Sequence, residues 1–131
     1  MTARSYVAVI DDDASLCRSL GRLLQSAGLS PITYRSAEEF LDDQMRVPFS
    51  CLVVDVQLEG MSGMELNRRL TACQIRTPVI YITANDDPEV RQEAMNAGGS
   101  AFFRKTDPGK DILAAIRKAM AAALPQRLSA V

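Results

Sequence analysis

Residues 51–63 have the sequence CLVVDVQLEGMSG, in which an unbroken apolar run is followed by one aspartate at the start of a glycine-containing loop. Four consecutive apolar residues, 51–54, predict a strand buried on both faces, as in a parallel sheet covered by helices. Such sheets bind ligands at the carboxyl ends of their strands, and Asp55 stands at such an end. An aspartate there is also a common turn former or helix cap, so the rest of the chain has to decide its role.

Short apolar runs alternate with longer periodic segments along the chain. Strands are predicted at 6–10, 31–34, 51–54, 78–82 and 101–103. Helices, with apolar residues three and four apart, are predicted at 14–27, 37–41, 63–73, 88–97 and 108–124, the last ending before Pro125. The residues placed to cap these helices are Asp13, Ser36, Ser62, Asp87 and Asp107.

Five strands alternating with five helices predict a doubly wound α/β fold, with helices on both faces of an open five-stranded parallel sheet. The strand at 31–34 has mixed polarity and starts with a proline, so we place it at a sheet edge. The other four strands are apolar and suit covered positions, which matches the flavodoxin-like order 2-1-3-4-5. We expect one domain over residues 1–124 and a C-terminal tail or linker start at 125–131.

Composition narrows the class of protein. The 131 residues carry a formal net charge of −1, which argues against nucleic-acid binding by this chain itself, and the short apolar run near the N-terminus predicts no membrane association. Cys17, Cys51 and Cys73 lie in separate apolar stretches, so we expect small buried thiols in a cytoplasmic, reducing compartment. The sequence contains no histidine, so any imidazole chemistry must come from a partner.

Polar side chains follow several of the predicted strands. The first and third strands are neighbours, so Asp11 and Asp12 should meet Asp55 across about 4.8 Å. Carboxylates that close repel, so either one is protonated or a cation lies among them, and oxygen ligands beside a polar loop suit Mg²⁺. Lys105 after the last strand can extend towards Asp55, with the Thr83 hydroxyl between them. Such a set can accept a phosphoryl group, with Asp55 as the nucleophile.

Four segments carry a resemblance to a known family. They are Ile10-Asp11-Asp12-Asp13, Val54-Asp55-Val56-Gln57-Leu58 with Gly60-Met61-Ser62-Gly63, Ile82-Thr83-Ala84, and Phe102-Phe103-Arg104-Lys105. In this order and spacing the chain resembles a response-regulator receiver domain of the CheY-like superfamily, from about residue 5 to about residue 124. The segment Ala94-Met95-Asn96-Ala97-Gly98 looks most like FixJ-type receivers, which usually precede a helix-turn-helix DNA-binding domain.

The resemblance implies a role for individual residues. It implies Asp55 as phosphoacceptor, Asp12 as direct Mg²⁺ ligand, Asp11 as a ligand through water, the backbone carbonyl of Gln57 as a further ligand, Thr83 as switch hydroxyl, Phe102 as switch aromatic and Lys105 as the cation on the phosphoryl group. The expected function is that of a two-component signalling domain and not of an enzyme. Its expected partners are a histidine kinase or phosphotransfer protein, and an effector domain or second copy bound to the surface of the last two helices and the last strand.

Two residues depart from the family pattern. The family usually has a proline after the lysine, often with a cis bond, whereas this chain has Thr106. A cis bond before a non-proline residue costs about 2.5 to 4 kcal/mol, so a trans bond and a differently shaped loop are expected, and the reach of Lys105 depends on that loop. Glu59 stands where the family often has proline and adds an acid beside the metal loop.

Two other functions fit parts of the sequence. Asp11-Asp12-Asp13-Ala14-Ser15 can be interpreted as the nucleophile motif of a small haloacid-dehalogenase-type phosphatase, although the chain is short for one and that mechanism gives Asp55 no role. A receiver-like docking module that is never phosphorylated is the other alternative, because Thr106 replaces the usual proline.

Overall fold

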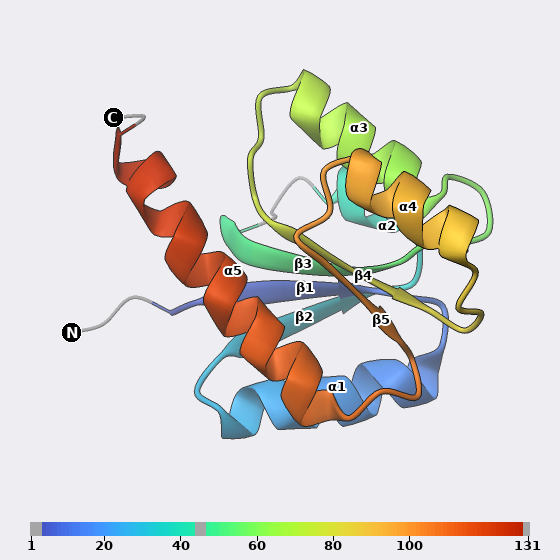
Figure 1. Cartoon of the computed structure of the whole chain (residues 1–131). Helices are drawn as coiled ribbons and strands as arrows, with labels where there is room; N and C mark the ends of the chain where they lie inside the picture. The colour runs from blue at the N-terminus through green and yellow to red at the C-terminus, as the bar shows by residue number, and fades with distance from the viewer. Residues whose placement is uncertain (1–3, 44–46, 130–131) are drawn as a thin grey trace.

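The computed structural model describes residues 4–43 and 47–129, with backbone only for 124–129, and it confirms the doubly wound α/β fold. The strands are β1 Tyr6–Ile10, β2 Ser30–Tyr34, β3 Phe49–Asp55, β4 Val79–Thr83 and β5 Ala101–Arg104. The helices are α1 Ala14–Ser26, α2 Ala37–Asp42, α3 Gly63–Ala72, α4 Pro88–Asn96 and α5 Gly109–Ser129. All strand pairs are parallel, in the predicted order β2-β1-β3-β4-β5 (Figure 1).

Helices cover both faces of the sheet, which explains the unbroken apolar runs. Figure 1 shows α1 and α5 on one face and α2, α3 and α4 on the other. Alternate strand residues enter different cores: Val53 packs with the α1 and α5 residues, whereas Leu52 and Val54 pack with those of α2 and α3. Because both alternating sets are buried in the interior strands, the buried polar residues of these strands, Asp55 and Thr83, stand at strand ends.

The edge position predicted for β2 is confirmed. Among the strands of residues 4–43 and 47–129, β2 pairs with β1 alone, and Pro31, opposite Val7, stands in the outermost strand. Proline has no backbone N–H to donate to a neighbouring strand, so an edge is where it disrupts the sheet least. The apolar strands β1, β3 and β4 thereby hold the three interior positions.

Four of the five predicted helix caps are present. The carboxylate of Asp13 accepts from the N–H groups of Ser15 and Leu16, and that of Asp87 accepts from the N–H of Glu89. The Ser36 and Ser62 hydroxyls accept from the N–H groups of Glu39 and Glu65, respectively. These caps fix where α1, α2, α3 and α4 begin, immediately after the loops at the carboxyl ends of the strands.

Three local predictions are wrong. Asp107 does not cap α5, because its carboxylate accepts from the N–H of Arg104 and closes the turn after β5. Helix α5 continues through Pro125 to Ser129, since the alanine-rich segment before the proline strongly favours helix. Cys73 is exposed, because the buried face of α3 ends at Leu70 and Cys73 already lies at the C-cap.

Candidate functional site

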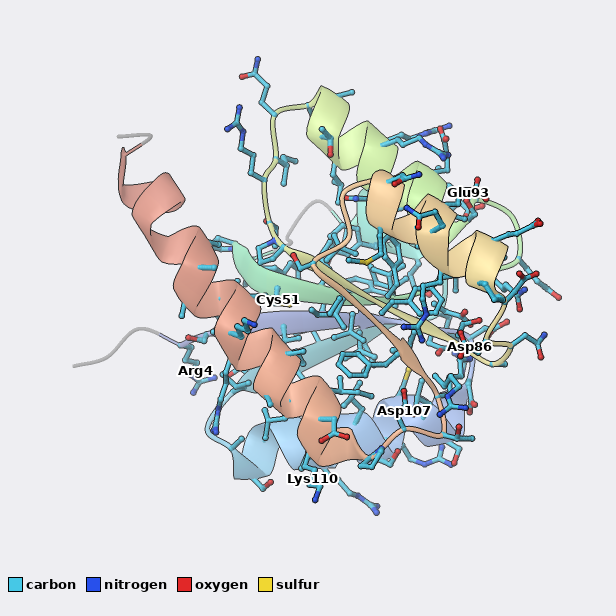
Figure 2. The ribbon with its side chains drawn as sticks, in the orientation of Figure 1. Arg4, Cys51, Asp86, Glu93, Asp107 and Lys110 are labelled. Carbon is cyan, nitrogen blue, oxygen red and sulfur yellow. The ribbon has the colours of Figure 1, made fainter. Side chains whose placement is uncertain are left out.

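The strand register brings the predicted site residues to one edge of the sheet. Ile10 is opposite Val54, so the next residues, Asp11 and Asp55, lie side by side at the ends of the neighbouring strands β1 and β3. On the other side, the N–H of Lys105 donates to the carbonyl of Thr83 at 2.8 Å, which places the start of the β5–α5 loop beside the end of β4. Figure 2 shows Asp86 and Asp107 on the loops that follow β4 and β5 at this same edge.

Three carboxylates converge as predicted. One oxygen each of Asp11, Asp12 and Asp55 lies within 4.8 Å of the others, and the set could hold a metal ion. Asp11 is 1% exposed and Asp55 3% exposed, whereas Asp12 is exposed to solvent. Two buried carboxylates so close together need a positive charge, and their hard oxygens fit Mg²⁺. The Gln57 N–H donates to Asp55 Oδ1 at 2.9 Å, while the role of the Gln57 carbonyl stays a prediction.

Lys105 supplies a positive charge to both buried carboxylates. Its Nζ lies 2.9 Å from Asp11 Oδ2 and 2.9 Å from Asp55 Oδ2. No peptide bond among the described residues is cis, so Lys105 and Thr106 are joined by a trans bond and the side chain reaches the site nonetheless. Although burial alone would lower the pKa of the Lys105 ammonium, the hydrogen bonds to Asp11 and Asp55 raise it above its ordinary value. The ammonium is therefore charged at neutral pH.

The site residues lie within a segment that matches a known protein family. The family model described as the response regulator receiver domain matches residues 7–117, which includes Asp11, Asp55, Thr83 and Lys105. The chain belongs to the response regulator receiver domain family. The phosphatase interpretation is therefore wrong, and Asp13 of its supposed motif is used as the cap of α1.

Individual relatives agree with this assignment. The receiver is 36% identical over 125 residues to the transcriptional regulatory protein FixJ of Bradyrhizobium diazoefficiens, covering 95% of this chain and 61% of the relative. It is 35% identical over 126 residues to the response regulator protein TodT of Pseudomonas putida, covering 96% of this chain and 56% of the relative. The receiver thus spans little more than half the length of these relatives, and the FixJ-like character expected from the sequence is confirmed.

Solved structures show the same fold. The structure of the response regulator StyR has a TM-score of 0.86 at 36% identity, covering 97% of this chain and 64% of that one. The crystal structure of FixJ-N has a TM-score of 0.82 at 33% identity, covering 92% of this chain and 96% of that one. Within the described part of the receiver, none of the helices combines the length and apolarity needed to cross a bilayer.

Thr83 of the receiver lies at the site but its hydroxyl is turned to its own loop. The side chain is fully buried, and its Oγ1 donates to the carbonyl of Asn85 at 2.9 Å and accepts from the N–H of Asn85 at 3.2 Å. These two bonds close a local turn at the start of the β4–α4 loop. For this hydroxyl to bond a group on Asp55, that turn has to open.

Phe102 lies on the same sheet face as Thr83. It is opposite Tyr81, two residues before Thr83, and is 8% exposed. The guanidinium of Arg91 covers its ring, with Cζ 5.0 Å from the ring centroid, and the same guanidinium lies 3.4 Å from Asp86 of the β4–α4 loop. No pattern in the sequence indicates this role of Arg91, because the stacking depends on how α4 packs against β5.

The carboxyl of Asp11 has a raised pKa. Burial, reinforced by the charge of Asp55, raises the pKa of its carboxyl from the ordinary value of 3.8 to about 6, although the Asp13 N–H and Lys105 oppose the rise. The sequence predicts that the repulsion between these carboxylates has to be relieved by a proton or a cation. Lys105 provides part of that relief in the structure, and the raised pKa shows that it is incomplete.

Without Mg²⁺, we expect the free energy of unfolding to depend on pH through Asp11. The pKa of Asp11 in the folded protein, about 6, exceeds the ordinary value of 3.8, so the stability that this residue contributes is fully present below pH 3.8 and is lost as pH rises through about 6. Denaturant unfolding of Asp11→Asn and the parent should therefore diverge across this window, the variant gaining about 1 to 3 kcal/mol relative to the parent by pH 7. A difference that stays constant with pH would contradict this.

Proposed function

We propose that this receiver accepts a phosphoryl group on Asp55 from a phosphohistidine of a partner kinase or phosphotransfer protein, in the cytoplasm and with Mg²⁺. The observation that supports this most is the placement of the Lys105 ammonium 2.9 Å from both Asp11 and Asp55, inside a cluster of three carboxylates. Because the chain has no histidine, the donor imidazole belongs to the partner. TodT and StyR, named above, are response regulators, for which a kinase partner and an effector are expected.

In the proposed step an oxygen of Asp55 attacks phosphorus and forms an acyl phosphate. The bond between phosphorus and the partner's imidazole nitrogen breaks, and its electron pair stays on the imidazole. Asp55 is held for this by two contacts, the Gln57 N–H on Oδ1 and the Lys105 ammonium on Oδ2. Lys105 also offers positive charge to the phosphoryl oxygens, which is the main help that proteins give to phosphoryl transfer.

The metal would be held by the carboxylates of the site. We assign Asp11, Asp12 and Asp55 as side-chain ligands, directly or through water, and the Gln57 carbonyl as a backbone ligand. When bound, Mg²⁺ would supply further neutralisation of negative charge. Exposed Asp12 leaves the ion an open approach from solvent, whereas buried Asp11 and Asp55 define the inner side of the site.

The proposed switch transmits the modification to the surface formed by α4, β5 and α5. Thr83 exchanges its bonds with Asn85 for a bond to the phosphoryl group, which moves the β4–α4 loop. Phe102 and the Arg91 that covers it then rearrange, because Arg91 is tied to Asp86 of that loop. The altered surface would bind an effector domain or a second copy of the chain.

Acetyl phosphate with Mg²⁺ provides the test of this function. Intact-mass measurement should show the addition of one phosphoryl group per chain, lost again on standing because acyl phosphates hydrolyse. No labelling, together with no Mg²⁺ binding by titration calorimetry, would overturn the proposal and favour a docking module that is never phosphorylated.

Thr83→Ala should separate phosphorylation from switching. We expect labelling within about threefold of the parent, because the Thr83 hydroxyl bonds Asn85 and not the Asp55 carboxylate in the described structure. We also expect loss of the phosphorylation-dependent shifts of α4 and Phe102 resonances in NMR spectra. Thr71→Ala, an exposed threonine of α3, is the matched control and should behave as the parent. Unchanged phosphorylation-dependent shifts in Thr83→Ala would remove Thr83 from the switch.

A further inference from the structure

An acidic side chain from α2 reaches the loop that follows the phosphoacceptor. Glu38 Oε2 accepts a hydrogen bond from the N–H of Met61 at 3.1 Å, across 23 positions of sequence. Met61 belongs to the β3–α3 loop, residues 56–62, which begins directly after Asp55 and contains Gln57. The proposed function gives this loop the task of presenting a backbone ligand, yet it uses no residue of α2.

Glu38 stands on a well-anchored turn. Its neighbours in α2, Ala37 and Phe40, are 0% and 3% exposed, and the Phe40 ring packs edge-on against Tyr34 with centroids 5.1 Å apart. The helix begins at the Ser36 cap, which bonds the Glu39 N–H. Although the Glu38 side chain is exposed, its backbone is therefore fixed relative to the core.

The loop is shaped to receive this carboxylate. Gly60 has a φ of +76°, in the left-handed region that side chains other than glycine rarely adopt. A Cβ placed on Gly60 would also overlap Glu38 Oε2 and approach Glu38 Cδ to 3.2 Å. The conformation of Gly60 and the position of Glu38 thus match, and the carboxylate fills the space that a side chain would need.

The two ends of the loop are held differently. Near Asp55 it is tied by the bond from the Gln57 N–H to Asp55 and by the bond from the Gly63 N–H to the Val56 carbonyl at 3.4 Å. Between these ends, Leu58 is buried in the core and the Met61 side chain packs against it, while the Met61 backbone is held by its hydrogen bond to Glu38. Loss of that bond would release the backbone around Met61 while leaving Asp55 and the side-chain packing in place, so the backbone between Gln57 and Met61 would become less ordered.

We propose that Glu38 is a positioning residue, which orders the β3–α3 loop so that its backbone is ready to bind the divalent cation. This inference rests on the proposed function, because it assigns the loop to cation binding. A hydrogen bond to a charged acceptor at an exposed position predicts that Glu38→Ala weakens Mg²⁺ binding by about three- to tenfold. Overall stability should change little, since Glu38 lies outside the core.

Two further variants separate hydrogen bonding from charge. Glu38→Gln keeps an oxygen that can accept from Met61 but removes the charge, so it should retain most of the affinity for Mg²⁺. Glu39→Ala removes an equal charge from the adjacent exposed position, whose carboxylate bonds the Arg35 N–H instead, and should bind Mg²⁺ as the parent does. A purely electrostatic effect of α2 would instead weaken all three variants alike.

The experiment combines Mg²⁺ titration calorimetry with hydrogen exchange of the Met61 amide in metal-free protein. The proposal expects faster Met61 exchange and weaker Mg²⁺ binding in Glu38→Ala, with neither change in Glu39→Ala. Parent-like Met61 exchange or parent-like Mg²⁺ affinity in Glu38→Ala would overturn it, as would an equal loss in Glu39→Ala. A parent protein that binds no Mg²⁺ would instead refute the proposed function, and Met61 exchange would still report whether Glu38 orders the loop.

Discussion

Asp55→Asn is expected to reduce labelling by acetyl phosphate and Mg²⁺ to background, a loss of at least about 100-fold, because an amide cannot act as the attacking carboxylate. The variant should fold, since Asn can still accept from the Gln57 N–H and its neutral side chain relieves the repulsion with Asp11. Intact-mass measurement of the phosphorylated fraction over time provides the readout.

The control for Asp55→Asn is the same substitution at an exposed acid. Asp111→Asn lies in the first turn of α5 and should be labelled at the parental rate. Labelling of Asp55→Asn at that rate would show that another side chain is the acceptor. Asp11 and Asp12, the other acids of the cluster, would then be the next to substitute.

The fold could be predicted because several local signals agreed. Apolar runs marked the strands to within about two residues, and Pro31 marked the edge strand. Once the strand order was known, Asp11 and Asp55 had to meet, since β1 and β3 are neighbours in register. The acidic cluster was thus predictable from topology and not from any single motif.

The remaining details depend on contacts that local sequence does not encode. Asp107 precedes a proline, as helix-capping residues often do, yet its carboxylate accepts a hydrogen bond from the Arg104 N–H in the turn after β5. Two contacts are made by exposed side chains: the Arg91 guanidinium stacks on the Phe102 ring, and the Glu38 carboxylate bonds the Met61 N–H. The positions of these side chains follow from how α4 and α2 pack. Neither exposed side chain carries a periodicity or a spacing that would reveal its partner.

Lys105→Met should destabilise the metal-free protein, because it removes the ammonium that lies 2.9 Å from both buried carboxylates while keeping a side chain of similar length. Leaving buried charges without their partner predicts a loss of about 1 to 3 kcal/mol in the free energy of unfolding at pH 7.5. Because Lys105 lowers the pKa of Asp11, the variant takes up the Asp11 proton at a higher pH than the parent does, so the loss should shrink on acidification and be smallest below about pH 6.

Mg²⁺ distinguishes this electrostatic origin from a packing defect. A divalent cation among Asp11, Asp12 and Asp55 would replace the missing charge, so Mg²⁺ should raise the melting temperature of Lys105→Met more than that of the parent. Lys110→Met, an exposed lysine at the start of α5, should match the parent in both conditions. Equal stability of Lys105→Met and the parent without Mg²⁺ would mean that the ion pairs contribute nothing net to folding. The role of Lys105 would then be confined to the phosphoryl group, where the labelling rate of the same variant measures it.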